Sequence, residues 1–260
     1  MLIENRPGAA TTVGTEAVSR AAPDGTTLLV NTGNLVIAPH LRQLSYDPLT
    51  SFEPICRLVD TPMFVVVNAA SPFHSLADLV SQARARPGEL AFASVGPATT
   101  LHIAFEMLKR RANLDVVYIP FPGSAPAVNA LLGGHVTAVI AEYPAAVELV
   151  RSGKLRALAT ASRHRIEPLS NVPTIAEAGY PSYEATVWYG VLAPAKTPRE
   201  VVSRTATWYT QAMAIPQLEE KLRAQGFFPV GACFADFKDF LREQYDAYGR
   251  VIREANIRAE

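Results

Sequence analysis

Short apolar segments of strand length recur along this chain, and most of them are continuous rather than alternating with polar residues. They are residues 26–32, 64–68, 90–94, 115–121, 135–141, 155–161 and 187–194. Valine and other residues that favour strands are common in them. Continuous apolar runs of this length are typical of strands that are buried on both faces, as in parallel sheets.

Helix starts are predicted between several of these segments. In residues 75–78, 174–177 and 197–200 a hydroxyl side chain precedes an acidic residue by three positions, as in a capping box. Pro198 also suits the first position of a helix. Strands that alternate with helices over short loops form βαβ units. The sequence therefore predicts an α/β fold with mainly parallel sheets that helices cover on both faces.

Two domains are predicted. The segments 64–68 and 187–194 enclose a block with its own strands and helices, residues 71–189, which we expect to be inserted into a discontinuous domain of residues 1–70 and 190–260. No Gly/Ser-rich linker occurs, so ordered strands must join the domains. The C-terminal helix, 234–255, has apolar side chains at helical spacing that we expect in the core rather than in a binding stripe. They are Phe237, Phe240, Leu241, Tyr245, Tyr248 and Ile252.

Charge and hydropathy exclude several classes of partner. The 24 basic and 24 acidic side chains give a formal net charge of zero, so no basic surface for nucleic acid is indicated. The longest apolar runs are much shorter than a membrane span, and direct membrane insertion is not predicted. Residues 1–6 have none of the features of a secretory signal, so a chain translated as written is expected to be cytoplasmic.

Metal and cofactor sites are not predicted. Cys56 and Cys233 lie far apart and lack the spacing of a zinc site or a redox pair, and we expect two buried or inert thiols. The five histidines also lack metal-ligand spacing. No Walker loop occurs, and no GxGxxG motif follows a predicted strand.

Two strand-to-helix junctions in the central block have the composition of an anion site. Each gathers small residues and hydroxyls before a helix N-terminus, where unpaired N–H groups and the helix dipole favour negative charge. In parallel α/β sheets, ligands bind beyond the carboxyl ends of the strands. For either junction taken alone, ordinary helix capping is the better explanation. If the two junctions face one cleft, capping and carboxylate binding are equally open. The candidates are Ser94, Gly96, Thr99 and Thr100 in one junction and Gly123, Ser124, Ala125 and Pro126 in the other.

Three further candidates each have a structural alternative. The turn Thr32-Gly33-Asn34 in the other domain allows close backbone approach and offers polar side chains, or is a plain turn. His102, near a helix start, either reaches the loop or has a structural role. Glu142 follows a predicted strand and either accepts a hydrogen bond from a ligand or a water or caps the next helix.

Catalysis is the weakest hypothesis. No GxSxG elbow and no HExxH motif occurs in the chain. A hydrolase would have to use Ser94 or Ser124 with His102, and no acidic partner is visible that would position this base. We therefore expect a binding protein rather than an enzyme.

Five segments, in this order, resemble the substrate-binding receptors of tripartite tricarboxylate transporters, also called Bug-type receptors. They are ENRPGAATTVGTEAVSRAAPDGTTLLV, LSYDP, FASVGPATTLH, PFPGSAPAVNALLGGHV and VPTIAEAGYPSYEATVWYGVLAPAKTP. The resemblance implies a type II periplasmic-binding-protein fold, in which two α/β lobes joined by crossing strands close on a small carboxylate. It implies that loops 94–100 and 123–126 hold one end of the ligand and that turn 32–34 supplies part of the opposite lobe. It also implies membrane permease subunits as partners.

The chain departs from the family pattern in two places. It opens at MLIENRPGA, where members first have a signal peptide, a strand, a loop and a helix, so we expect an N-terminally incomplete first lobe. Thr137 stands where similar members carry an acid, and no amino-acid specificity is transferred. We predict a periplasmic receptor that captures a di- or tricarboxylate, an acidic amino acid or an aromatic acid in an interlobe cleft. An intracellular ligand-sensing module of the same fold is the alternative.

Overall fold

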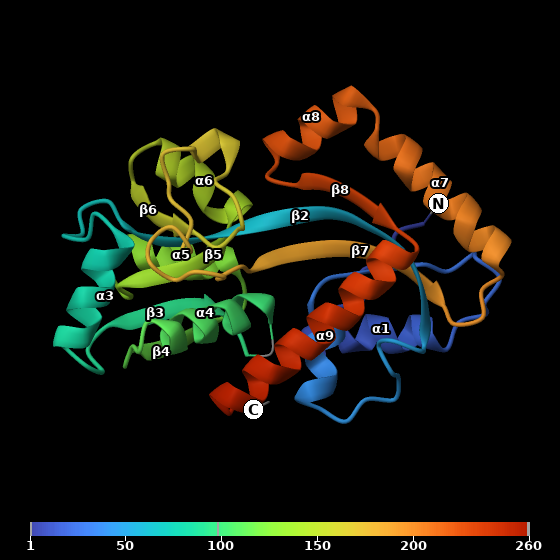
Figure 1. Ribbon diagram of the computed structural model, residues 1–260, viewed down its shortest axis with the longest axis horizontal. Coiled ribbons are helices and arrows are strands. Elements are labelled where there is room, and N and C mark those ends of the chain that lie inside the picture. The colour runs from blue at the N-terminus through green and yellow to red at the C-terminus, as the bar shows by residue number, and fades with distance from the viewer. Residues whose placement is uncertain (1, 98, 259–260) are drawn as a thin grey trace. The chain divides into compact units, whose positions relative to one another are not determined.

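The computed structural model describes residues 2–97 and 99–258, and the chain divides into two compact units (Figure 1). The chain passes from unit 1 to unit 2 within strand β2 and returns within strand β7. Ordered strands therefore make both crossings. The sequence predicted the boundaries between the two domains after residue 70 and before residue 190. Unit 1 comprises Met1–Asp60 and Trp188–Glu260, unit 2 comprises Thr61–Val187, β2 spans Phe52–Asn68 and β7 spans Thr186–Pro194.

Unit 2 is built on a sheet with the strand order β6-β2-β5-β3-β4. Its further strands are β3 (Ala91–Val95), β4 (Val117–Phe121), β5 (Ala138–Glu142) and β6 (Leu155–Thr160). β3 is parallel to β4 and β5, whereas β2 is antiparallel to β5 and β6. The register pairs Met63 with Glu142 and Phe64 with Thr160. The carboxyl ends of the four parallel strands therefore meet at the edge where β2 enters the unit.

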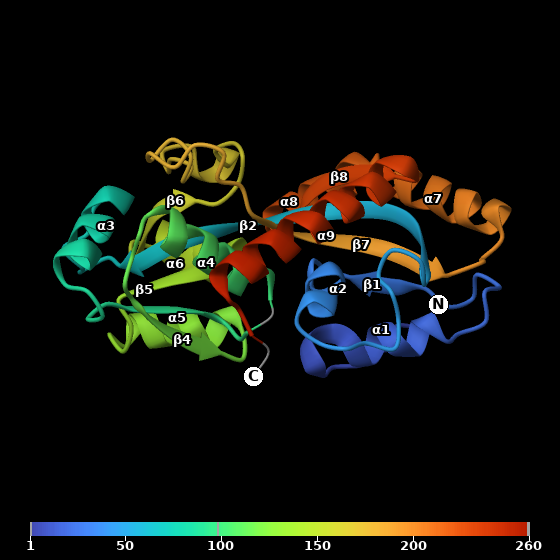
Figure 2. The same ribbon diagram turned by 60° about the horizontal axis from the view of Figure 1, so that its bottom comes forward.

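Helices flank this sheet (Figure 2). α4 and α5 both pack against β3 and β5, and α6 packs against β5 and β6. α3 begins with the predicted capping box, in which the hydroxyl of Ser75 accepts a hydrogen bond from the N–H of Asp78 and the carboxylate of Asp78 accepts one from Ser75. The helices of unit 2 are α3 (Leu76–Ala85), α4 (Thr100–Arg111), α5 (Ser124–Leu132), α6 (Tyr143–Arg151) and the 3-10 turn η3 (Glu167–Leu169).

The helix expected after Thr174 does not form. Thr174 and Glu177 make both hydrogen bonds of a capping box, but the residues that follow form turns. Gly179 has a φ of 107° and Pro181 comes two residues later, so the backbone leaves the helical conformation before a second turn can propagate. A local capping pattern therefore predicts only the first turn.

Unit 1 contains the strand order β1-β7-β2-β8, with β1 at Leu29–Asn31 and β8 at Phe228–Cys233. β1 is antiparallel to β7, and β8 is antiparallel to β2. This unit differs from the expectation of mainly parallel sheets, because apolar runs reveal strands but not their direction. β8 and the first half of β2 were not predicted, since Pro229 and Gly231 interrupt β8 and Arg57 and Asp60 interrupt β2.

The helices of unit 1 include the expected long C-terminal helix, α9. Of the six side chains expected in the core, Phe237, Leu241, Tyr248 and Ile252 are buried, whereas Phe240 and Tyr245 are only partly buried. α7 begins after Pro198, while Thr197 donates its hydroxyl to the carbonyl of Pro194 instead of capping the helix. The elements are η1 (Ala9–Thr11), α1 (Thr12–Ser19), α2 (Asn34–Ile37), η2 (Ala38–His40), α7 (Arg199–Met213), α8 (Pro216–Ala224) and α9 (Ala235–Ala255).

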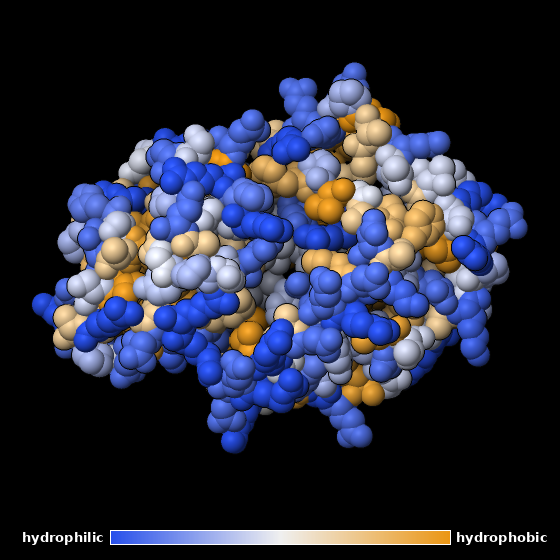
Figure 3. All heavy atoms as spheres, viewed as in Figure 1, coloured by the Kyte–Doolittle hydropathy of each residue, from blue (hydrophilic) through white to orange (hydrophobic). Residues whose placement is uncertain are grey.

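The surface is mostly hydrophilic on the face that Figure 3 shows, and hydrophobic residues gather there only in small groups. None of the helices within residues 2–97 and 99–258 combines the length and the apolar character that a membrane span requires.

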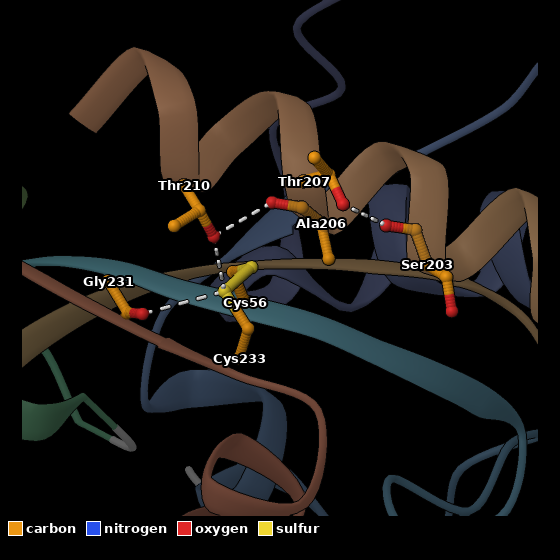
Figure 4. The surroundings of a disulfide bond; sticks show 7 residues. All are labelled: Cys56, Ser203, Ala206, Thr207, Thr210, Gly231 and Cys233. Carbon is orange, nitrogen blue, oxygen red and sulfur yellow. Dashed lines mark hydrogen bonds between the residues drawn. A yellow bond between two sulfur atoms is a disulfide. The ribbon is translucent and has the colours of Figure 1, made fainter. Parts of the chain in front are cut away.

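The two cysteines form a disulfide bond, Cys56–Cys233, so the expectation of two buried or inert thiols was wrong (Figure 4). The antiparallel pairing of β8 with β2 places the two residues directly opposite each other. The bond lies in an apolar cluster with Val202 and Ala206 of α7. The separation of 177 residues hid this pairing, because it depends on a strand that the sequence pattern did not reveal.

Candidate functional site

Both predicted anion loops lie at the same edge of the sheet of unit 2. β3 and β4 are parallel neighbours, and their last residues, Val95 and Phe121, are level in the register. The first loop continues from Val95 into α4, and the second continues from Phe121 into α5. The N–H of Gly96 donates to the carbonyl of Phe121 over 2.9 Å, which joins the two loops directly. The structure thus brings the two junctions together.

Thr99 has the capping role that was its structural alternative. It is the N-cap of α4, and its hydroxyl accepts a hydrogen bond from the N–H of His102. The same hydroxyl donates to the carbonyl of Gly96 over 2.9 Å. Ala98, which the resemblance includes in this loop, lies outside the described residues.

Two other hydroxyls at these helix starts are buried and have no hydrogen-bond partner among the described residues. They are Oγ1 of Thr100, the first residue of α4, and Oγ of Ser124, the first residue of α5. A buried hydroxyl without a partner costs about 1–3 kcal/mol. Such groups in native structures are commonly satisfied by a ligand or a water, and both of these stand at helix N-termini.

The remaining residues of the second loop are partly or fully exposed. Gly123 is the N-cap of α5 in an extended conformation, with a φ of 179° that any residue can adopt. Ala125 and Pro126 are exposed in the first helical turn. Ser124 and Ala125 therefore each bring an N–H that no earlier turn of the helix can accept.

The two loops themselves carry no lysine or arginine. Residues 94–102 and 121–126 contain neither lysine nor arginine, and the basic residues of α4 lie in its last turn. Within the loops, negative charge would therefore be stabilised by hydroxyls and by N–H groups at helix N-termini.

His102 is a buried, neutral side chain. Its ring stacks on that of Tyr118, with ring centroids 4.6 Å apart, and its Nε2 lies 3.9 Å from Oε1 of Glu106. Burial lowers the pKa of His102 to about 4, and Lys109 adds a smaller effect in the same direction. Burial also raises the pKa of Glu106.

No hydrolytic pair is assembled. Nδ1 of His102 and Oγ of Ser124 each have no hydrogen-bond partner in the described part of the chain, so they are not bonded to each other. Ser94 is completely buried, and its hydroxyl is 3.5 Å from the carbonyl of Ile140 on the neighbouring strand β5. Ser94 is thus buried within the sheet, and its role in ligand binding stays a prediction.

Glu142 ends β5 and occupies the N-cap position of α6, but its side chain makes no capping hydrogen bond. Thr137, at the other end of the same strand, accepts a hydrogen bond from the N–H of Ala91 at the start of β3. Of these two positions, only Glu142 lies at the edge with the loops. The role of Glu142 in ligand binding stays a prediction.

Thr32 and Gly33 lie in unit 1 between β1 and α2, and Asn34 is the first residue of α2. Gly33 is the N-cap of α2 with a helical φ of −51°, so no unusual conformation requires glycine. The N–H of Thr32 donates to the side chain of Asn31, and the hydroxyl of Thr32 is 3.4 Å from the N–H of Asn34. The turn is locally hydrogen-bonded, and its role in binding stays a prediction.

Tyr118 is a residue at this edge that the sequence did not single out. It lies on β4, and its hydroxyl donates to the carbonyl of Val95 over 2.7 Å. In the run of residues 115–121, nearly all apolar, no alternation shows which face each side chain takes. Only the pairing of β4 with β3 reveals that this tyrosine faces the first loop.

The fold is that of a two-lobed periplasmic binding protein. The solved structure of the periplasmic binding protein BugD matches with a TM-score of 0.87 at 29% sequence identity, over 99% of this chain and 87% of that chain. The solved structure of R. palustris Rpa4515 with adipate matches with a TM-score of 0.90 at 32% identity, over the same shares of the two chains. Both matches extend over the two units and the strands that join them.

The family follows from the sequence comparison. The family model of the tripartite tricarboxylate transporter receptors matches residues 1–257. Protein BugT of Bordetella pertussis is 34% identical over 261 residues, which cover 99% of this chain and 80% of BugT. The chain belongs to the tripartite tricarboxylate transporter receptor family, a family of solute-binding receptors rather than enzymes. The resemblance seen in the motifs is confirmed.

Proposed function

We propose that this protein binds a small carboxylate reversibly at the two anion loops of unit 2 and delivers it to a tripartite tricarboxylate transporter. The observation that carries the proposal is the pair of buried hydroxyls, on Thr100 and Ser124, that have no partner among the described residues. Each is the first residue of a helix. The two helices follow the adjacent parallel strands β3 and β4, whose last residues are level in the register.

The chemistry of the loops suits a carboxylate. One carboxylate group accepts several hydrogen bonds, and hydroxyls and first-turn N–H groups are the donors available here. The match to Rpa4515, a protein solved with adipate, supports a ligand of this class. Release of the ligand unchanged is expected from the family, whose members are solute-binding receptors.

Isothermal titration against a panel of carboxylates tests the proposal. The panel contains adipate, malate, citrate, glutamate and benzoate, each paired with its amide or alcohol analogue. We expect at least one carboxylate to bind and its uncharged analogue not to bind. The proposal is overturned if no member of a broad carboxylate panel binds to the folded protein.

Two conservative substitutions test the site. Thr100→Val and Ser124→Ala each remove one hydroxyl, and we expect each to weaken carboxylate binding by about 10- to 100-fold, since hydrogen bonds to charged groups contribute about 1.5–3 kcal/mol. The matched control is Thr205→Val, because Thr205 is also a buried helical threonine but donates to the carbonyl of Val201 in unit 1. Unchanged affinity in both Thr100→Val and Ser124→Ala would place the ligand elsewhere.

We further propose that the protein works in the periplasm with permease subunits. The disulfide supports this location, because such bonds persist in oxidising compartments.

We also propose that Thr32 and Asn34 of unit 1 contact the ligand. Replacement of Asn34 by alanine is expected to weaken binding without loss of fold, as measured by the same titration and by circular dichroism. Wild-type affinity in that variant would remove Asn34 from the site.

A further inference from the structure

We propose that Tyr118 is a positioning residue, which holds both anion loops in the geometry that binds the carboxylate. This inference rests on the proposed function and deepens it. Tyr118 lies on β4, three residues before the end of the strand that leads into the second loop. Its hydroxyl reaches across to the first loop and donates to the carbonyl of Val95 over 2.7 Å.

Two hydrogen bonds join the described residues of the first loop to β4, and this is one of them. Beyond the last pair of the β3–β4 ladder, the N–H of Gly96 donates to the carbonyl of Phe121 over 2.9 Å. The bonds of Thr99 to Val95 and Gly96 stay within the loop. The Tyr118 hydroxyl and the carbonyl of Phe121 therefore hold the two sides of one peptide group, Val95–Gly96, to β4. A displacement of this peptide group must break both hydrogen bonds.

The ring of Tyr118 is held on the side of α4. It stacks on His102, with centroids 4.6 Å apart and an interplanar angle of 28°, and on Phe105, with centroids 5.1 Å apart and an angle of 25°. His102 lies in the first turn of α4, the helix whose N-terminus is part of the proposed site. Because the stacked rings limit its rotation, the hydroxyl is fixed relative to Val95 and to the start of α4. The side chain of Tyr118 thus contacts both the first loop and α4, while its backbone belongs to β4, the strand that leads into the second loop.

This arrangement gives His102 a role that needs no contact with the ligand. The ring is buried and stacks on Tyr118, so it supports the residue that fixes the loop. Binding geometry is sensitive to displacements of about 1 Å in such supporting groups. Removal of the tyrosine hydroxyl should therefore weaken binding even though the hydroxyl itself does not touch the carboxylate.

Tyr118→Phe tests the inference, and the chain offers a closely matched control. Tyr183 also donates its hydroxyl to a backbone carbonyl over 2.7 Å, that of Ala104 in the middle of α4, away from the loops. Both Tyr118→Phe and Tyr183→Phe remove one hydroxyl and keep the ring. We expect Tyr118→Phe to weaken carboxylate binding by about 5- to 50-fold, and Tyr183→Phe to lower the melting temperature with affinity within about twofold of wild type.

A ligand-free measurement separates this inference from the proposed function. In Tyr118→Phe we expect faster amide hydrogen exchange at Gly96, with wild-type exchange there in Tyr183→Phe. If wild type binds no carboxylate, the proposed function fails, and the exchange of Gly96 still decides whether Tyr118 holds the loop. Wild-type affinity in Tyr118→Phe overturns the positioning role, and so does an equal loss of affinity in both variants, which would show general destabilisation.

Discussion

A neutral histidine in the first turn of α4 makes the stability of this protein sensitive to acid. The pKa of His102 is about 4 in the folded state, because the ring is buried, against about 6.5 in an unfolded chain. Between these values the unfolded state binds more protons, so the free energy of unfolding falls as the pH drops from about 7 towards 4. Glu106 acts in the opposite direction, because burial raises its pKa and the folded state then binds the extra proton.

The substitution His102→Phe isolates the contribution of the histidine. It keeps an aromatic ring against Tyr118 and removes the titrating group. We expect wild type to lose about 2 kcal/mol more of its free energy of unfolding between pH 7 and pH 4.5 than the variant loses. Urea unfolding at the two pH values measures this difference. Parallel losses in the two proteins would show that His102 is charged or exposed in the folded state.

Among the elements, β8 depends most on a single covalent link. It pairs with β2 at the edge of the sheet of unit 1, and Pro229 and Gly231 interrupt its pattern. The disulfide Cys56–Cys233 ties β8 to the buried strand and closes a loop of 177 residues. In the loop-entropy model, a closure of this length contributes about 5 kcal/mol, and measured values for native disulfides reach a similar size.

Reduction of this bond should destabilise the protein strongly. We expect a thiol reductant to lower the melting temperature of wild type by 10 °C or more, on the order of what about 3–5 kcal/mol implies for a chain of this size. The double variant Cys56→Ala/Cys233→Ala should melt at the lower temperature with or without reductant. Complete alkylation of both cysteines in the untreated, denatured protein would contradict the bond.

The whole molecule has one strand that belongs to both sheets. β2 pairs with β8 in unit 1 and with β5 and β6 in unit 2. Since β2 carries buried residues in both units, loss of β2 from one set of strands removes support from the other. The two units should therefore unfold together, although each has its own core.

Calorimetry tests this coupling. We expect a single transition whose calorimetric enthalpy equals the van't Hoff enthalpy, as in two-state unfolding. A bound carboxylate at 100 times its Kd should raise the free energy of unfolding of the whole chain by about 2.7 kcal/mol. Two resolved transitions, of which only one moves with ligand, would show that the units unfold separately.

The elements built from local patterns were predicted well. The seven apolar segments all contain strands, and the capping box at Ser75 begins α3 as expected. Where patterns were interrupted the prediction failed: β8 was missed, and the turn after Thr174 was expected to be a helix. Capping motifs report on one turn of backbone, whereas the continuation of a helix depends on the residues and the packing that follow.

The sequence by itself determined the α/β class and the two strand-to-helix loops, because apolar periodicity, hydroxyls and helix starts are local properties of the chain. The family, too, was recognisable from the order of its motifs. Only the tertiary structure decided that Cys56 faces Cys233, that the hydroxyls of Thr100 and Ser124 are buried without partners among the described residues, and that Tyr118 reaches Val95. Each of these depends on which strands pair and in which register, and such long-range contacts have no local signal in the sequence.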